Sequence, residues 1–392
     1  MTWANFANPG EAARFKEFSA DYQKKTGTQV KYQTVVGTYA TKMITQLAGG
    51  AAPDVFYNND ELMAKSIESG SVMALDDYLN SADAKVKAED SYPGLLKMCQ
   101  KDGKTYGIPV DCNPKVFWFN KKLLTAAGVT QDPAAMFEAG TWNQAALDDL
   151  LTKVKASGKT PMPLESTWFD LCGWITTFGG KAIDDKGRAI FDQDPKALSV
   201  IEWLFQNMKD EKIQYAGSLP KGQALDALFL ASQMATIQYG RWILPNIKKI
   251  KGFEYDIAPL PSESGKDVAE TAVYTVGLSV NAKAKDPKAA LDFMAAFTNA
   301  DGQRFRLTGG GNAVPSVNGL DDVVTEGNLP PHGKYFTEVA KKGYTIPQVL
   351  VENPAVSSTF VAELNKIYLS TLKSGDVKSF AAKAANLMNG KA

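Results

Sequence analysis

The stretch PDVFYNND, residues 53–60, decides how the first part of this chain folds. Its apolar run VFY has the composition of a short buried strand, and Asn58, Asn59 and Asp60 follow at once. None of these three side chains is a nucleophile, but all of them form hydrogen bonds readily. Because α/β proteins bind ligands beyond the carboxyl ends of their strands, the stretch predicts a strand that leads into a ligand site.

The residues before this stretch alternate between strand and helix patterns. Strand-like segments at 2–6 and 30–36 are separated by helical patterns at 8–27 and 38–50, and Asn8 can cap the first helix. Strands that alternate with helices at this spacing predict a parallel, doubly wound sheet. The loops that follow the three strands then meet at one edge of that sheet.

A second α/β pattern begins after Val110. KVFWFN predicts a strand, TWNQAALDDLL predicts a helix capped by Thr141, and YDIAPLP predicts another strand. The C-terminal third ends in helical stretches at 357–372 and 377–388. A chain of 392 residues is too long for one ordinary core, so these patterns predict two α/β domains.

Composition narrows the possible chemistry. Lys plus Arg and Asp plus Glu each number 43, and the resulting net charge of zero argues against nucleic acid as a partner. A single histidine, His332, disfavours a Ser-His-Asp triad and, with only three scattered cysteines, a zinc site. We therefore expect no metal and no cofactor. Cys99 and Cys112 flank a predicted hairpin, and the residues leave open a disulfide between them or buried thiols.

Aromatic side chains recur beside small polar ones at predicted element ends. A sugar ring offers an apolar face that an aromatic ring can cover, and a rim of hydroxyls that carboxylates, amides and arginine can bind. The pattern therefore predicts a carbohydrate site. Its candidate residues are Asn5, Phe6, Asn59, Asp60, Asp111, Trp168, Arg241, Trp242, Tyr274 and Asn312.

Several of these candidates have a purely structural alternative. Asp60 could cap the helix that follows it, Asp111 could be a turn residue, and Arg241 could be an ion-pair partner. Trp168 and Trp242 each stand near a Gly, Ser or Thr at a predicted element end, which leaves both ligand contact and core packing open. For Asp60 we favour ligand contact, because the two preceding asparagines offer alternative caps.

A set of short segments occurs in a fixed order over nearly the whole chain. It includes QLAGGAAPDVFY, SGSVMALDDYL, GKTYGIPV, FNKKLLTAAGV, TWNQAALDDLL, MATIQYGRW, YDIAPLPS, VGLSVNAKAKDPKAALDFMAAFT and GNAVPS. In this order the segments resemble the extracellular solute-binding proteins of carbohydrate ABC transporters, family 1, the group that contains maltose-binding protein. The ordered set is specific for the family but not for one sugar.

The resemblance implies an α/β fold of the type II periplasmic-binding-protein class. Two doubly wound lobes would be joined by three hinge crossovers and would close on a ligand in the cleft between them. The crossovers would fall near residues 110–112, 261–271 and 310–315. The N-terminal lobe would comprise 1–111 plus about 268–312, and the C-terminal lobe 112–262 plus 313–392.

The resemblance also implies positions for the ligand contacts. They are Asn5, Phe6, Asn59, Asp60, Asp111, Gly240, Trp242, Tyr274 and Asn312, with Trp168 where members often carry a stacking aromatic. The chain departs from the common pattern at TAVYTVG, where paired glycines with a tryptophan are frequent. Either Tyr274 stacks in place of that tryptophan, or the floor of the pocket differs.

What the resemblance implies about function is a receptor and not an enzyme. The protein would capture an oligosaccharide and deliver it to the membrane permease of an ABC importer. It would be a monomer that works outside the cytoplasm, either in the periplasm or anchored to the cell surface by a lipid on a cysteine upstream of this chain. The residues leave two alternatives open: a glycan-cleaving enzyme with a convergent acid pair, and a receptor for a non-sugar solute such as an iron chelate or a polyamine.

Overall fold

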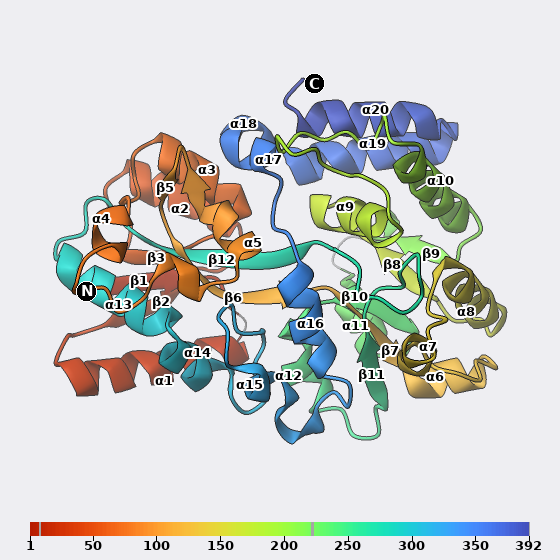
Figure 1. Cartoon of the computed structure of the whole chain (residues 1–392), viewed down its shortest axis with the longest axis horizontal. Coiled ribbons are helices and arrows are strands. Elements are labelled where there is room, and N and C mark those ends of the chain that lie inside the picture. The colour runs from red at the N-terminus through yellow and green to blue at the C-terminus, as the bar shows by residue number, and fades with distance from the viewer. Residues whose placement is uncertain (8, 221–222, 392) are drawn as a thin grey trace. The chain divides into compact units, whose positions relative to one another are not determined.

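The computed structural model describes residues 1–7, 9–220 and 223–391, and the chain divides into two compact units (Figure 1). Unit 1 is built from Met1–Cys112, Thr275–Glu326 and Leu350–Ser358. Unit 2 is built from Asn113–Tyr274, Gly327–Val349 and Thr359–Ala392. The lobes predicted from the sequence assign residues 313–326 and 350–358 to the second lobe, whereas both segments lie in unit 1.

The main sheet of unit 1 has the strand order β2-β1-β3-β12-β6. Strand β1 pairs in parallel with β2, with Trp3 opposite Tyr32, and in parallel with β3, with Ala4 opposite Phe56. Strand β12 pairs with β3 in the antiparallel direction. The parallel β-α-β-α-β opening predicted from the sequence is therefore confirmed, and the carboxyl ends of β1, β2 and β3 share one edge.

Unit 1 combines this sheet with helices from three separate stretches of the chain. Its elements are β1 (Thr2–Asn5), α1 (Pro9–Thr26), β2 (Lys31–Thr34), α2 (Tyr39–Ala48), β3 (Val55–Asn58), α3 (Asp60–Glu68), α4 (Asp76–Leu79), η1 (Ala88–Asp90), α5 (Pro93–Leu96), η2 (Lys97–Cys99), β4 (Gln100–Lys101), β5 (Lys104–Thr105), α13 (Pro287–Thr298), α14 (Ala300–Leu307), α15 (Asp321–Thr325) and α18 (Pro354–Ser357). Four further elements span the boundaries of the units: β6 (Ile108–Pro114), β12 (Val273–Val280), η5 (Glu326–Asn328) and α17 (Gln348–Glu352).

Helix α1 shows how an apolar stripe fixes one element of unit 1. Phe15, Phe18 and Tyr22 recur at helical spacing and are buried. Phe15 packs edge-on against Trp3 of β1, with ring centroids 5.6 Å apart. The helix stops before Gly27, whose φ of 77° lies in the left-handed region that glycine adopts without strain. The predicted cap of this helix, Asn8, lies outside the described residues.

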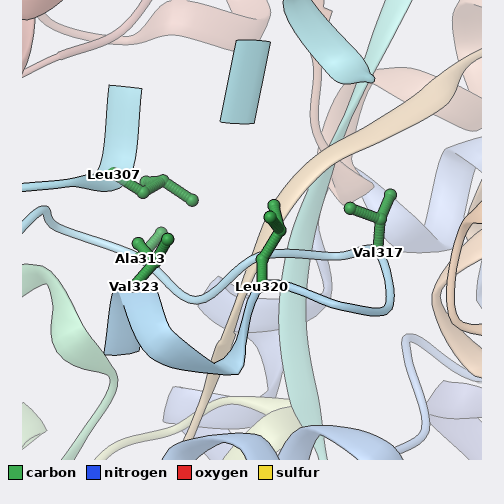
Figure 2. Packing of buried hydrophobic residues seen from close by; sticks show 5 residues of the cluster. All are labelled: Leu307, Ala313, Val317, Leu320 and Val323. Carbon is green, nitrogen blue, oxygen red and sulfur yellow. The ribbon is translucent and has the colours of Figure 1, made fainter. Parts of the chain in front are cut away.

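A second apolar cluster of unit 1 lies after α14. Figure 2 shows its buried side chains, which are Leu307, Ala313, Val317, Leu320 and Val323. Leu307 closes α14 and Val323 belongs to α15, so the cluster ties both ends of the connecting loop to the core. That loop carries the candidate residue Asn312.

The strands of unit 2 surround β7. Strands β10 and β11 pair with β7 on its two sides, both in the antiparallel direction. Strands β8 and β9 form a parallel pair, and a parallel bridge from Thr160 to Met234 joins the segment before β8 to the segment before β10. Unit 2 therefore combines an antiparallel sheet around β7 with a parallel pair of strands.

Unit 2 packs many helices around these short strands. Its elements are β7 (Val116–Asn120), α6 (Lys121–Ala126), α7 (Pro133–Glu138), α8 (Gln144–Ala156), β8 (Met162–Leu164), α9 (Trp168–Thr177), α10 (Pro195–Lys209), β9 (Ile213–Tyr215), η3 (Ala216–Ser218), α11 (Leu225–Leu230), β10 (Thr236–Tyr239), η4 (Arg241–Ile243), α12 (Leu244–Ile247), β11 (Tyr255–Ala258), α16 (Lys334–Lys342), α19 (Phe360–Ser374) and α20 (Val377–Met388). Helices α19 and α20 lie side by side (Figure 1).

The N-terminus of α8 corrects one expectation from the sequence. Asn143, and not Thr141, is the N-cap, and its Oδ1 accepts a hydrogen bond from the N–H of Ala146 at 3.1 Å. The hydroxyl of Thr141 instead donates to the carbonyl oxygen of Met136 at 3.1 Å. Both residue types favour the cap position, so their relative place in the turn decides the outcome.

The three cysteines are free, buried thiols. The alternative of a disulfide between Cys99 and Cys112 is therefore not realised. Burial raises the pKa of Cys99 and of Cys172 to about 12, so both thiols stay protonated and unreactive at neutral pH. In the part of the chain that the structure describes, no helix has the length and apolar character needed to cross a membrane.

Candidate functional site

Two buried asparagines lie at the carboxyl ends of the neighbouring strands β1 and β3. Asn5 ends β1 and is fully buried, and Asn59 follows β3 and is 9% exposed. The hydroxyl of Tyr32 donates to Oδ1 of Asn5 at 2.8 Å. Nδ2 of Asn5 and Oδ1 of Asn59 have no hydrogen-bond partner among the described residues. Because buried polar atoms are costly when unpaired, this edge offers one donor and one acceptor to a bound molecule.

Asn58 has a more structural role than Asn59. Its Nδ2 donates to the hydroxyl oxygens of Ser66 at 2.8 Å and Ser279 at 3.1 Å, which ties β3 to α3 and to β12. Its Oδ1 is buried and has no partner among the described residues. The side chain of Asn58 is therefore held by two donated bonds, whereas the described part of the chain gives the side chain of Asn59 none.

Asp60 is the first residue of α3, and Asn59 occupies the N-cap position before it. Oδ1 of Asp60 accepts a hydrogen bond from the N–H of Glu61 at 3.1 Å. Burial raises the pKa of Glu61, and the neighbouring Asp60 raises it further. Two carboxyl groups thus stand at the N-terminus of α3, where the helix dipole favours negative charge.

Phe6 lies directly after β1 and is half-buried. It packs edge-on against Tyr39, at 5.1 Å between ring centroids, and against Tyr57, at 5.7 Å. The hydroxyl of Tyr39 donates to the carbonyl oxygen of Tyr57 at 2.7 Å, so Tyr39 belongs to the core. Phe6 therefore has a rigid aromatic support beneath a partly exposed ring.

Asn312 is joined to α1 through Glu11. Nδ2 of Asn312 donates to Oε1 of Glu11. Burial raises the pKa of Tyr32, and the negative charge of Glu11 adds to this effect. Glu11 thereby connects the loop of Asn312 electrostatically to the Tyr32–Asn5 pair. Sequence reasoning assigned neither Glu11 nor Tyr32 to the site, because each has an ordinary structural role in its own element.

Asp111 of β6 is 8% exposed and pairs with Arg306 of α14, at 3.1 Å from Oδ2 to Nη1. Burial raises the pKa of Asp111, while the guanidinium of Arg306 opposes that rise. Asp111 lies within strand β6, so it is not the turn residue that the sequence left open as an alternative.

In unit 2, a buried ion pair lies under the start of α9. Nζ of Lys115 donates to Oδ1 of Asp170, and both side chains are about 5% exposed. Oδ2 of Asp170 accepts from the N–H of Glu165 at 3.2 Å and from the hydroxyl of Thr167 at 3.3 Å. The carboxylate of Glu165 lies 3.8 Å from Nζ of Lys115, and about a third of its side chain is exposed. Lys115 and Glu165 are further residues that the sequence patterns did not single out.

Glu165 also contacts Tyr239, which packs against Trp242. A side-chain hydrogen bond links it to Tyr239, whose pKa is raised by burial and by Glu165. Burial raises the pKa of Glu165, Lys115 opposes that rise, and Asp170 adds to it. The Tyr239 and Trp242 rings lie 5.2 Å apart, and Trp242 is half-buried. A carboxylate beside partly exposed rings is the arrangement that suits a polyhydroxylated ring.

Gly240 allows the Trp242 ring to fold back over the backbone. A Cβ at this position would lie 2.3 Å from Cζ3 of Trp242 and 2.6 Å from Cβ of Asn113. Arg241 follows, is fully buried, and donates its backbone N–H to Oδ1 of Asn113 at 3.0 Å. Glycine is required here because a side chain would collide with the ring. The backbone conformation does not require it, since any residue can adopt a φ of −76°.

Trp168 and Tyr274 flank the ring of Phe169. Trp168 begins α9, is 5% exposed, and lies 5.5 Å from Phe169 between ring centroids. Tyr274 lies 6.3 Å from Phe169 and is half-buried. Nζ of Lys115 lies 4.5 Å from the centre of the Phe169 ring. Phe169 therefore contacts Trp168, Tyr274 and the charged end of Lys115.

The eleven candidates fall into two groups, one in each unit. Unit 1 contains Asn5, Phe6, Asn59, Asp60, Asp111 and Asn312, and unit 2 contains Trp168, Gly240, Arg241, Trp242 and Tyr274. Each group combines aromatic rings with amide or charged side chains. No set of three His, Cys, Asp or Glu side chains within 1–7, 9–220 and 223–391 is arranged to hold a metal ion.

Comparison with known proteins identifies the family whose sequences this chain matches. Residues 7–304 match the family model described as bacterial extracellular solute-binding protein. A probable ABC transporter-binding protein of Deinococcus radiodurans is 24% identical over 304 residues, which cover 73% of this chain and 68% of the relative.

Solved structures of substrate-binding proteins are similar over the full length. An ABC substrate-binding protein from Listeria monocytogenes in complex with cycloalternan has a TM-score of 0.83 at 20% identity, covering 100% of this chain and 98% of the other. The GacH receptor of Streptomyces glaucescens, solved unliganded and with acarbose, has a TM-score of 0.79 at 19% identity with the same coverage. The chain therefore has the two-lobed α/β fold of periplasmic binding proteins, as the sequence predicts.

Proposed function

Because this chain belongs to the family of bacterial extracellular solute-binding proteins, we propose that it is a receptor that binds a carbohydrate without altering it. The residues at the carboxyl edge of unit 1 and the aromatic group of unit 2 are the candidate sugar contacts of their respective units. The ligand would be an oligosaccharide, delivered to the permease of an ABC importer.

The observation that carries this proposal is a donor and an acceptor without described partners, one at each of two neighbouring strand ends of unit 1. Nδ2 of Asn5 and Oδ1 of Asn59 are a donor and an acceptor at neighbouring strand ends, without partners among the described residues. A sugar hydroxyl can accept from the first and donate to the second, since it has both functions. Each such bond made in a dry site contributes about 0.5–1.5 kcal/mol.

The aromatic residues of unit 2 support a ring-shaped ligand. Trp242 and Tyr274 are both half-buried, so part of each ring stays accessible. The carboxylate of Glu165 lies beside Tyr239, next to Trp242, and can accept hydrogen bonds from hydroxyl groups. Structural relatives crystallised with cycloalternan and acarbose agree with a saccharide of more than one ring.

Thermal-shift screening of the purified chain against a sugar library tests the proposal. The library would contain cycloalternan, acarbose, maltotriose and neutral disaccharides, together with spermidine and a ferric siderophore for the non-sugar alternative. We expect one or more saccharides to raise the melting temperature, because a ligand that binds only the folded state stabilises it. Stabilisation by spermidine or the siderophore alone would contradict a carbohydrate receptor.

A second measurement separates binding from catalysis. The stabilising saccharide is incubated overnight with the protein and analysed by chromatography. We expect the saccharide to be recovered intact. Cleavage products that increase with protein concentration would show a glycan-cleaving enzyme instead.

A further inference from the structure

Arg306 holds two consecutive residues of β6 from the neighbouring helix α14. Its Nη1 donates to Oδ2 of Asp111 at 3.1 Å, and its Nη2 donates to the carbonyl oxygen of Val110 at 2.5 Å. Nε donates to the carbonyl oxygen of Phe297 at 3.3 Å, and the guanidinium lies 4.0 Å from the centre of the Phe297 ring. All three kinds of guanidinium nitrogen are thus engaged inside unit 1.

Val110 and Asp111 lie just before the point at which the chain passes from unit 1 to unit 2. Strand β6 passes from unit 1 to unit 2 after Cys112, and β12 returns to unit 1 at Thr275. The hydroxyl of Thr275 donates to the carbonyl oxygen of Asp111 at 2.5 Å, and β12 and β6 are neighbours in the sheet. Arg306 and Thr275 therefore fix both the side chain and the peptide of Asp111 just before the boundary.

The charges around Asp111 make Arg306 its principal counterion. Burial raises the pKa of Tyr57 of β3 and of Cys112 of β6, and the negative charge of Asp111 raises both further, so these two neighbours stay neutral. Glu11 of α1 also faces Tyr57 and adds a negative charge to this surrounding. Burial thus favours a neutral Asp111, whereas the guanidinium of Arg306 favours the carboxylate.

We propose that Arg306 is a positioning residue for ligand binding, which acts through the carboxylate of Asp111. Nε, Nη1 and Nη2 of Arg306 each donate to a partner within unit 1, so the guanidinium is committed to these contacts and not to a ligand. By occupying Oδ2, it opposes the rise in the pKa of Asp111 that burial causes and holds the side chain in one orientation, so that the carboxylate can accept hydrogen bonds from the ligand. This inference rests on the proposed function, because it requires that Asp111 contacts the bound saccharide.

The pH dependence of binding distinguishes positioning from a merely structural role. Isothermal titration is carried out between pH 4 and pH 8 with whichever of acarbose, cycloalternan and maltotriose stabilises the wild type. In Arg306→Met the pKa of Asp111 rises further, so the loss of affinity on acidification moves to higher pH. At neutral pH we expect affinity to fall about tenfold or more, the range of a charge-assisted hydrogen bond. Arg306→Lys, which keeps the charge but not the fork, should shift the profile less.

Arg304 provides a matched control on the same helix. It pairs with Asp322 at the surface, with 45% of its side chain exposed, so Arg304→Met should leave both affinity and pH profile unchanged. In an Asp111→Asn background, replacing Arg306 should add little further loss of affinity, since the group it acts through is no longer a carboxylate. If Arg306→Met and Arg306→Lys both keep the wild-type pH profile, the inference is wrong while the receptor function stands. If the wild type binds no saccharide, the proposed function fails first, and this inference fails with it.

Discussion

Lys115 and Asp170 form a buried ion pair that joins the residue just before β7 to the first turn of α9. Their side chains are 5% and 4% exposed, and Asp170 also accepts hydrogen bonds from Glu165 and Thr167. The pair supports Glu165 through the hydrogen bond from its N–H to Asp170, and it supports Phe169, whose ring lies against Lys115. Its charges are satisfied within unit 2, so it is a support for the candidate site.

Lys115→Met should destabilise the protein by about 3–5 kcal/mol, because it leaves the charge of Asp170 buried without its partner. Urea unfolding measures this loss. Lys153→Met is the matched control: Lys153 pairs with Asp149 at the surface of α8, and its loss should cost less than about 0.5 kcal/mol. The double variant Lys115→Met/Asp170→Leu should recover most of the stability. A Lys115→Met protein as stable as wild type would contradict a buried ionised Asp170.

Glu165→Gln should stabilise the protein at neutral pH and have no effect at low pH. The pKa of Glu165 is raised in the folded state, chiefly by burial, so ionising it costs folding free energy. That cost is absent below the ordinary pKa of a glutamate and is complete above the raised value. Melting temperatures of wild type and variant from pH 3 to pH 8 measure the difference. Glu202→Gln, at an exposed position of α10, is the control, and a Glu165→Gln difference that does not change with pH would contradict the assignment.

Replacing Asn58 by alanine should lower stability, whereas replacing Asn59 by alanine should lower saccharide affinity. Asn58→Ala removes two donated hydrogen bonds and should cost about 1–3 kcal/mol of stability, measured by urea unfolding. Asn59→Ala removes a buried acceptor without a described partner, so stability should change by less than about 1 kcal/mol. Its saccharide affinity should instead fall about tenfold, measured by calorimetry. Wild-type affinity in Asn59→Ala would remove this residue from the site.

Trp242→Ala should weaken saccharide binding about tenfold, since a partly exposed ring next to Tyr239 provides a stacking surface. Trp203 is the comparison. Its Nε1 donates to Asp148 at 2.8 Å and its ring packs 5.9 Å from Trp174, so Trp203→Ala should lower stability without changing affinity. Equal affinities for wild type and Trp242→Ala in calorimetry would show that Trp242 only fills space.

Gly240→Ala should cost about 1–3 kcal/mol, because the new methyl group would overlap the Trp242 ring and force it to move. Saccharide affinity should decrease with it. Gly49→Ala is a suitable control: its φ of −80° is similar, and its nearest contact for a Cβ is 3.3 Å. Unfolding midpoints and titrations on both variants check the prediction, which an unperturbed Gly240→Ala protein would refute.

The sequence predicted the local architecture of unit 1 because its signals are local. Strand runs, the spacing of Phe15, Phe18 and Tyr22, and the break at Gly27 each act within one turn or one strand. The prediction that Thr141 caps α8 was wrong, because Asn143 lies two residues away and can also cap a helix. Boundaries within a turn depend on the backbone that tertiary packing selects.

The partnerships inside the candidate site were not accessible from the sequence. Lys115 and Asp170 are 55 positions apart, and Asp111 and Arg306 are 195 apart. A lysine or arginine in a loop or helix gives no local sign of a distant carboxylate, because only the folded sheet brings them together. The polar trio at the end of β3 was visible as a pattern. Its division into a structural Asn58 and an unsatisfied Asn59 follows from Ser66 and Ser279, which local spacing does not reveal.

The interleaving of the two units has a consequence for biosynthesis. Unit 1 needs Leu350–Ser358, and the hydroxyl of Ser357 donates to the carbonyl oxygen of Asp60 at 3.0 Å. A ribosome makes the chain from the N-terminus, so unit 1 stays incomplete until this segment has emerged, and unit 2 until α19 and α20 have followed it. Neither unit can therefore mature early in translation, and the nascent polypeptide remains open to chaperones while most of these residues are being made.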